Sequence, residues 1–308
     1  MGTLFALLSA LLWASYNLAV LRGRDQFDPG AGYLLTLALN AGATALFTLL
    51  PLPGAGAAGR SAAALACFVL AGLSTTLLGR WLYFASVYAI GPSRASAWKN
   101  ASPAYTLLVG WLLLNERPGL PTLAGVVATV GGMLALARDQ IRVGGLEGQG
   151  EASGGRPSQG RASGDARLGL LYGIGSALAF ASGILLRKAG LNLWPDAAMG
   201  SAIGAWSALM GWLPVAVRRG DHRTLLTARP EGMRFFLLAG VFSSLAQLCI
   251  FLSLRLAPSA VTHAVSSLEP IFTVMLSRWL LQGRERLTRG MLKAVAVSTL
   301  GVVLVSMR

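Results

Sequence analysis

The sequence is poor in charged residues, and acidic residues are the scarcest. Only 12% of its 308 residues are Asp, Glu, Lys or Arg, whereas soluble domains carry about 25%. The hydrophobic fraction is 54%, and 26 basic residues outnumber 12 acidic ones to give a net charge of +14. A soluble fold of this size could not bury so much apolar surface, so this composition excludes an ordinary globular domain.

Residues that usually build catalytic or metal sites are also rare. The two cysteines, Cys67 and Cys249, each lie inside an apolar run, and the two histidines, His222 and His263, are far apart in sequence. A match to the dinucleotide fingerprint at 54–59 follows an apolar run rather than a strand, which is the wrong context for that motif. We therefore expect no enzyme, no catalytic residue, no bound metal and no cofactor.

Long apolar runs fill most of the chain. We count ten, at approximately 3–22, 32–52, 62–88, 92–114, 120–137, 167–187, 197–217, 233–254, 258–281 and 290–307. Each is close to the roughly 20 residues that a helix needs to cross about 30 Å of hydrocarbon, and none has the period-2 alternation of a barrel strand. The sequence therefore predicts an all-α integral membrane protein with ten transmembrane helices.

The second half of the chain repeats the first. Residues 9–15 return in similar form at 176–182, and Pro103 returns as Pro270. We assign the parts as a first repeat (1–137), a flexible linker rich in glycine and arginine (138–166) and a second repeat (167–308). Because each repeat has five spans, an odd number, we expect two inverted five-helix repeats with a site near the membrane midplane.

The net charge does not indicate a nucleic-acid-binding protein, because the basic residues are scattered through short loops without interleaved aromatic residues. Most loop arginines follow spans one, three, five, seven and nine, whereas Arg187 and Lys188, at the end of span six, are counted among the few basic loop residues of the other face. By the positive-inside rule, this bias places the linker in the cytoplasm and both termini outside. The expected partners are a lipid bilayer and a small-molecule substrate, and the protein could be a monomer or a homodimer.

Four ionisable residues within the apolar runs are candidate site residues. Lys99 and Glu269 are the deepest, and Arg80 and His263 are less central. A charge at mid-bilayer costs about 2.5–3.5 kcal/mol on insertion scales, so it normally faces a cavity or a partner. We predict that Lys99 and Glu269 point into a central cavity, where they pair or hold opposite ends of a zwitterion. The alternative is that Glu269 braces a kink at Pro270 while Lys99 reaches the membrane surface.

Further candidate substrate-binding residues are polar or aromatic side chains in otherwise apolar runs: Trp13, Tyr16, Asn17, Trp98 and Ser266. Ordinary packing would explain them equally well. Pro103 and Pro270 lie within the fourth spans of their repeats, where a proline removes a helix hydrogen bond. We predict that both act as helix hinges, with a static kink as the alternative.

Small residues recur on one face of the fifth and tenth spans. Gly125 and Gly132 are seven positions apart, and their counterparts in the second repeat are Ala294 and Gly301. Small residues on one face let helices approach closely. The pattern predicts either packing of the fifth span on the tenth or a face for dimer formation.

Each fourth span combines a proline with a glutamate at its end. Pro103 precedes Leu-Leu-Leu-Asn-Glu-Arg at 112–117, and Glu269-Pro270 precedes Leu-Leu-Gln-Gly-Arg-Glu at 280–285, while Gly131-Gly132 lies late in the fifth run. This pattern resembles the EamA-like branch of the drug/metabolite transporter superfamily. The resemblance implies a secondary carrier in the cytoplasmic (inner) membrane and a structural role for Glu116 and Glu285 at the membrane edge. It also implies cytoplasmic termini, in conflict with the arginine count.

We therefore expect a secondary active transporter of small polar metabolites, an exporter or exchanger of amino acids or similar compounds that works by alternating access. The alternative is an efflux carrier for lipophilic cations. Such a carrier normally needs a membrane-embedded acid in an aromatic cavity, which Glu269 allows but Lys99 and Arg80 oppose.

Overall fold

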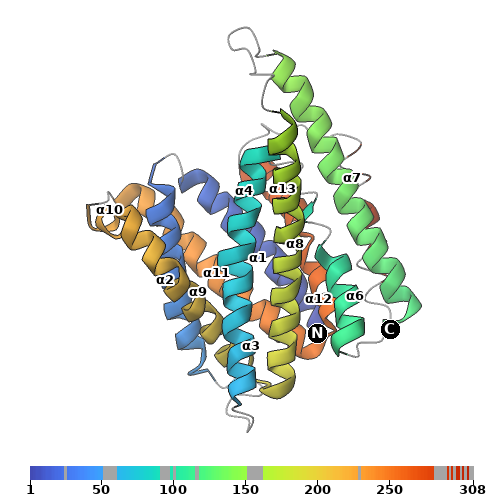
Figure 1. Ribbon diagram of the computed structural model, residues 1–308, viewed down its shortest axis with the longest axis horizontal. Helices are drawn as coiled ribbons and strands as arrows, with labels where there is room; N and C mark the ends of the chain where they lie inside the picture. The colour runs from blue at the N-terminus through green and yellow to red at the C-terminus, as the bar shows by residue number, and fades with distance from the viewer. Residues whose placement is uncertain are drawn as a thin grey trace. The chain divides into compact units, whose positions relative to one another are not determined.

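The computed structural model describes residues 1–23, 26–50, 61–90, 98–99, 102–114, 118–150, 162–227, 230–280, 290, 293, 296–298, 300–301 and 304. All regular structure in these residues is helical (Figure 1). The elements are α1 (Gly2–Gly23), α2 (Pro29–Phe47), α3 (Ala62–Gly72), a π-helix η1 (Leu73–Gly79), α4 (Arg80–Ile90), α6 (Ser102–Leu114), α7 (Leu120–Gly150), α8 (Ala162–Leu193), α9 (Ala197–Arg219), α10 (Asp221–Thr227), α11 (Pro230–Leu256), α12 (Ser259–Ser266) and α13 (Glu269–Leu280).

Six helical segments in the described residues are long and apolar enough to cross a membrane: Gly2–Gly23, Pro29–Phe47, Ala62–Tyr83, Arg167–Leu193, Ala197–Arg219 and Met233–Leu256. Two shorter apolar helices are Ser102–Leu114 and Leu120–Gly132. Large apolar side chains such as Leu113 and Leu120 are 77% and 82% exposed, as expected for surfaces in contact with lipid. The chain is an all-α, multi-pass membrane protein, and its arrangement as ten spans in inverted repeats stays a prediction.

The described chain forms two compact units. Unit 1 combines Met1–Leu77 with Gly183–Glu285, and unit 2 combines Leu78–Ser182 with Arg286–Arg308. Each unit therefore draws on both halves of the chain. The repeats are defined by the sequence pattern, whereas the two units are defined by how the helices pack. The division of the chain into repeats therefore differs from its division into units.

Helix extends into the segment that composition predicts to be a flexible linker. α7 continues to Gly150, and α8 begins at Ala162. Residues 151–161, the glycine- and serine-rich middle of the predicted linker, lie outside the described residues. The domain boundaries at 137 and 167 remain predictions from the repeat.

Within unit 1, α1 packs along α11 and also contacts α12 and α13, α2 contacts both α9 and α11, and α3 packs on α9. The contact between α3 and α9 depends on two glycines. A Cβ atom at Gly72 would overlap the carbonyl oxygen of Gly204 and the hydroxyl of Ser207. The two backbones therefore touch directly, which is the usual way that helices associate in lipid.

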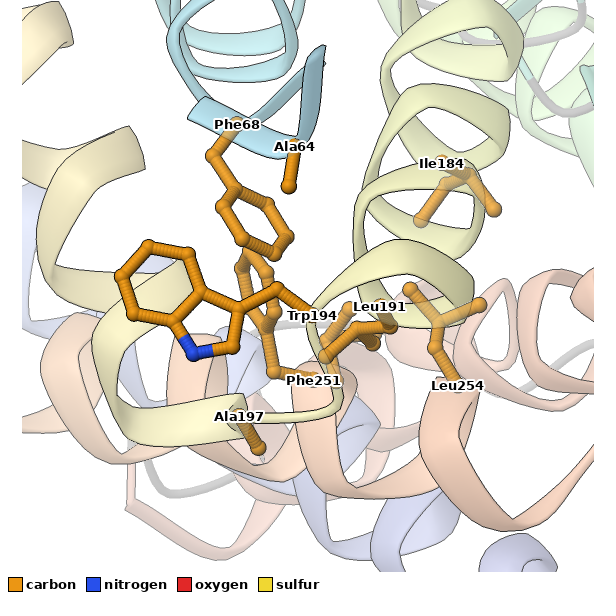
Figure 2. Close-up of a cluster of buried hydrophobic side chains, with 9 residues drawn as sticks. Ala64, Phe68, Ile184, Leu191, Trp194, Ala197, Phe251 and Leu254 are labelled. Carbon is orange, nitrogen blue, oxygen red and sulfur yellow. The ribbon is translucent and has the colours of Figure 1, made fainter. Parts of the chain in front are cut away.

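Three aromatic rings form the centre of the main core cluster of unit 1 (Figure 2). The ring of Phe68 lies 6.2 Å from that of Trp194 and 5.9 Å from that of Phe251, both at tilted angles. Glycines make room for the rings, because a Cβ at Gly190 would lie 2.5 Å from Phe68 and one at Gly200 would lie 2.8 Å from Phe251. This cluster ties α3, α8, α9 and α11 together.

The polar side chains of these apolar helices are hydrogen-bonded to nearby backbone or to neighbouring helices. The Ser9 hydroxyl donates to the carbonyl of Ala246 at 3.0 Å, which joins α1 to α11. The Asn40 amide donates to the Ser243 hydroxyl at 3.2 Å, which joins α2 to α11. Because lipid supplies no hydrogen-bond partners, such bonds are required inside the unit.

The π-helix interrupts the third span. Its wider turns leave backbone groups with altered partners, and the carbonyl of Thr76 accepts a hydrogen bond from the Tyr33 hydroxyl at 3.2 Å. The Thr75 hydroxyl donates to the carbonyl of Ala71 at 2.9 Å. The irregular turn is therefore held by α2 and by its own preceding helix, and π-turns of this kind are frequent at functional sites.

Unit 2 contains α4, α6, α7 and the first part of α8. The Ser86 hydroxyl of α4 donates to the carbonyl of Gly169 in α8 at 2.8 Å. A Cβ at Gly301 would lie 2.5 Å from the Thr129 hydroxyl and 2.7 Å from the carbonyl oxygen of Gly125. The fifth and tenth predicted spans thus pack through small residues, the first of the two alternatives that the glycine spacing allowed.

Substitution of Gly72 by alanine tests the α3–α9 contact. Because the added methyl group meets a backbone carbonyl, the helices must separate, and overpacking of this kind typically costs about 1–3 kcal/mol. We expect a lower melting temperature of the purified protein in detergent. The matched control is Gly42→Ala in α2, where no atom lies within 4 Å of the new Cβ; equal melting temperatures for the two variants would contradict the close contact.

Candidate functional site

The ninth predicted span is a broken helix. α12 ends at Ser266, Ser267 and Leu268 form a turn, and α13 begins at Glu269. The turn is closed by backbone bonds from Ser267 to His263 at 3.0 Å and from Leu268 to Val265 at 3.2 Å. In membrane proteins, broken helices of this kind expose backbone groups and side chains that can bind ligands.

Pro270 does not lie in the middle of a continuous helix, because it is the second residue of α13 and follows the turn of Ser267 and Leu268. A proline in the first turn of a helix removes no helix hydrogen bond, because that N–H has no partner within the helix. Pro103 lies in α6, next to residues 100–101, which are outside the described residues. The hinge role of both prolines stays a prediction.

Glu269 and Asn17 form a close polar pair in unit 1. The Asn17 amide nitrogen donates to a carboxylate oxygen of Glu269 at 2.6 Å, and both side chains are partly buried. α1 brings Asn17 to this position because it packs against both α12 and α13. The carboxylate also lies at the N-terminus of α13, where the helix dipole favours negative charge.

Two aromatic residues of α1 lie on the turn before Asn17. Trp13 meets Tyr16 edge-on, with ring centroids 5.3 Å apart. Tyr16 is buried in a cluster with Ala19 and Ala239 of α11, and Trp13 is only partly buried. Since residues 13 and 17 are four apart, Trp13 and Asn17 share one face of α1.

His263 and Ser266 are both buried in α12. The Ser266 hydroxyl donates to the carbonyl of His263 at 3.1 Å, so it satisfies the end of α12. These two predicted site residues therefore belong to the same helix break as Glu269. This local hydrogen bond gives the Ser266 hydroxyl a structural role at the end of α12, in addition to its predicted role in substrate binding.

Lys99 lies in unit 2 among aromatic rings. Its ammonium nitrogen is 5.4 Å from the ring centroid of Tyr83 in α4 and 5.4 Å from that of Phe180 in α8. Both distances are within the range of a cation–π contact. The charge of Lys99 is thus close to two aromatic rings, and its predicted place in a central cavity stays a prediction.

Trp98 and Arg80 also belong to unit 2. Trp98 is half-buried and close to α8, since a Cβ at Gly173 would lie 3.1 Å from the Cβ of Trp98. Arg80 is partly buried at the first residue of α4. The predicted residues therefore fall into two groups: Trp13, Tyr16, Asn17, His263, Ser266, Glu269 and Pro270 in unit 1, and Arg80, Trp98, Lys99 and Pro103 in unit 2. The predicted pairing of Lys99 with Glu269 stays a prediction.

Sequence reasoning missed Arg187. We counted it among loop residues at the end of the sixth span, but α8 continues to Leu193 and Arg187 is only 6% exposed. One guanidinium nitrogen, Nη2, donates to the Thr75 hydroxyl at 3.0 Å, and the guanidinium carbon lies 5.3 Å from the ring centroid of Phe251. A signal was present: Gly183, Arg187 and Gly190 follow the i, i+4, i+7 spacing of a packed helix face.

The neighbouring Lys188, also counted as a loop residue, has a structural role. Its ammonium group donates to the carbonyls of Leu254 at 2.7 Å and Ala257 at 3.0 Å. These carbonyls lie at and just beyond the C-terminal end of α11, where a lysine satisfies unpaired carbonyls and favours the helix dipole. Lys188 therefore joins α8 to α11.

In the part of the chain that the structure describes, no group of three or more His, Cys, Asp or Glu side chains could hold a metal ion. The chemistry available at the sites above is hydrogen bonding and charge recognition. The carboxylate of Glu269 can accept a proton or an ammonium group, and the cation of Lys99 can attract an anion.

The chain matches the family model of the EamA-like transporter family over residues 1–138 and 167–307. No curated protein is matched by this sequence. Among solved structures, one described only as the crystal structure of a protein is similar with a TM-score of 0.71 and 14% sequence identity, over 99% of this chain and 97% of that one. At this identity the likeness shows a shared fold.

Removal of the Asn17 amide tests the hydrogen bond to Glu269. In Asn17→Leu the partly buried carboxylate loses a donor at 2.6 Å, and bonds to charged groups contribute about 1.5–3 kcal/mol. We expect a lower melting temperature in detergent, with part of the loss recovered when Glu269→Gln is added. Asn192→Leu, at an exposed position of α8, is the control, and an equal effect there would contradict a specific contact.

Proposed function

Because the chain belongs to the EamA-like transporter family, we propose that it is a secondary active transporter that carries small polar metabolites across the membrane by alternating access. The proposal includes ten spans in two inverted repeats, a location in the cytoplasmic membrane, and export or exchange of amino acids or related compounds. The family membership gives a transporter of the drug/metabolite type. The side chains described above support the recognition of a charged substrate, and the sequence pattern is the basis for the span number and the location.

The observation that carries the proposal is the Asn17–Glu269 pair. A partly buried carboxylate beside an amide donor, at the start of a helix that follows a break, can be neutralised by a proton or by an ammonium group. Either event changes the charge inside an apolar unit. Glu269 is therefore proposed to bind the coupling proton, the amino group of a substrate, or each in turn.

Lys99 supports recognition of an anionic group. Its ammonium nitrogen lies within cation–π range of the rings of Tyr83 and Phe180, and a positive charge in an apolar unit can attract an anionic group. We propose that Lys99 and Glu269 recognise opposite ends of a zwitterionic metabolite.

The helix break supports the conformational part of the proposal. α12 and α13 are joined by the two-residue turn of Ser267 and Leu268, and Pro270 lacks an N–H with which to continue a helix from the preceding residues. A change of angle at this turn would disturb only the few backbone bonds that close it, such as that from Ser267 to His263. The proposed hinge at Pro270, and its counterpart at Pro103, would let half-helices tilt as access alternates.

A second candidate function is efflux of lipophilic cations. It is favoured by the aromatic pair of Trp13 and Tyr16, one turn from the Asn17–Glu269 contact. An acid next to aromatic rings suits a lipophilic ammonium ion. The positive charge of Lys99 opposes it, so the polar-metabolite proposal is preferred.

Glu269→Gln in proteoliposomes tests the coupling role. The substrate is first chosen from amino acids and organic acids by its stabilisation of the purified protein, since a ligand of the native state raises its stability. We expect the variant to lose accumulation driven by a pH gradient by about tenfold or more while keeping counterflow of labelled substrate, because the amide can bind but cannot exchange a proton. Unchanged pH-driven accumulation would rule out Glu269 as the proton site.

Lys99→Met tests recognition of the anionic group. The side chain keeps its length and its contact with the two rings but loses the charge, so we expect a loss of zwitterion transport of about tenfold or more with normal expression. The matched control is Lys293→Met, at an exposed helical position, which should transport normally. If Lys99→Met instead gains efflux of quaternary amines with no loss for amino acids, the second candidate function is the better one.

A further inference from the structure

We infer that Arg187 forms an anion site that binds the carboxylate of a small metabolite. The inference rests on the proposed transport function and narrows its substrate class to metabolites that carry a carboxylate. It starts from a residue outside the predicted site, in the part of α8 that belongs to unit 1.

The first step is the charge of Arg187. The side chain is 6% exposed, and arginine keeps its proton in proteins. Three described acidic residues are engaged elsewhere. Asp28 and Asp196 cap helices, and Glu269 accepts a hydrogen bond from Asn17. Among the described residues, no carboxylate pairs with Arg187, and a buried charge without a counter-charge is strongly unfavourable.

The second step is the hydrogen-bonding capacity that remains. Nη2 donates to Thr75, whereas Nε is buried and has no hydrogen-bond partner among the described residues. A buried donor without a partner is rare in native proteins and calls for an explanation. A carboxylate supplies both the missing acceptor and the missing negative charge, and guanidinium groups match carboxylate geometry.

The third step is how firmly the guanidinium is held. The Thr75 hydroxyl gives its own hydrogen to Ala71, so its lone pair is directed to accept from Arg187. On the other side, the Phe251 ring lies against the guanidinium carbon. A Cβ at Gly183 would overlap Thr75, so the glycine allows α8 to approach the π-turn closely. The group is thus positioned by its neighbours before any ligand binds.

The surroundings of the ring add a polar side chain. Gln247 lies one turn before Phe251 on α11 and is 6% exposed, so the two share a helix face. Its amide nitrogen would lie 3.8 Å from a Cβ at Gly204. A carboxylate at Arg187 would lie beside the Thr75 hydroxyl and the Phe251 ring, a setting that suits a small polar acid rather than a lipophilic cation.

Thermal stability of the full-length protein in detergent tests the site directly. The probes are carboxylates paired with their primary amides, from acetate and acetamide to hexanoate and hexanamide, together with amino acids and amino-acid amides. Because only binding to the native state raises stability, we expect at least one carboxylate to raise the melting temperature and its amide to leave it unchanged. The absence of such a difference in every pair would overturn the inference.

Variants locate the effect. Arg187→Gln is expected to lower carboxylate affinity by about tenfold or more, because it removes a charged donor. Arg187→Lys keeps the charge without the planar fork and should lose less, and Thr75→Val keeps the guanidinium but frees it to move, so it should also weaken the shift. If Arg187→Gln does not fold, the other two variants still decide the question. The control is Arg234→Gln, an exposed arginine that lies 4.9 Å from the ring centroid of Phe235.

The outcomes separate this inference from the proposed function. A carboxylate shift in Arg187→Gln and Arg187→Lys equal to that of the unmodified protein would assign Arg187 a structural role and overturn the site. If carboxylates and amides are both carried in proteoliposomes with equal efficiency, the transporter proposal stands and the anion site fails. If carboxylates bind at Arg187 but none is carried, the anion site stands and the proposed function fails.

Discussion

Direct contact between helix backbones is the constraint on which the described structure depends. In lipid, helices gain little from burying apolar side chains, so close packing and internal hydrogen bonds must hold them together. Gly72 meets Gly204 across the α3–α9 contact, and Gly183 meets Thr75 across the contact of α8 with the π-turn. These approaches leave space for the rings of the core and decide which polar side chains are enclosed.

Some enclosed polar groups are satisfied within the unit, whereas Arg187, Trp212, Asp221 and His222 each retain a buried atom without a partner among the described residues. Ser9, Asn40 and Lys188 each join two segments of the chain by bonds to a carbonyl or a hydroxyl. Arg187 has one such bond but retains a buried nitrogen without a partner in the described residues. Buried polar groups stabilise a membrane protein most when every donor is paired. A buried charged group with an unpaired donor, such as Arg187, therefore calls for a functional explanation.

The two units offer different chemistry. In unit 1 the carboxylate of Glu269 accepts a hydrogen bond from the amide of Asn17 on another helix. The same unit holds the guanidinium group of Arg187. In unit 2 the ammonium group of Lys99 lies against two aromatic rings. A carrier that moves charged metabolites through an apolar layer needs such groups, and it needs the segments that bear them to change position, which the turn between α12 and α13 would permit.

Much of the architecture followed from sequence because its causes are local. Long apolar runs require helices in lipid, so the helical class and the EamA-like family were predictable from composition, the repeat and the Pro–Glu pattern. The small-residue spacing also located the packing of Gly301 on Gly125. Within the predicted site, the choice of Asn17 and Glu269 rested on their polarity in apolar runs, and each proves to be the partner of the other.

Tertiary structure alone decided the rest. Where Arg187 lies depends on how far α8 continues and on which helices pack against it, and neither is encoded in the residues beside it. Pro270 looks the same in a sequence whether it kinks a helix or starts one, because a proline excludes the helical hydrogen bond in both cases. The sequence by itself determined that polar groups had to be enclosed in apolar helices; only packing between distant segments decided which of them found partners.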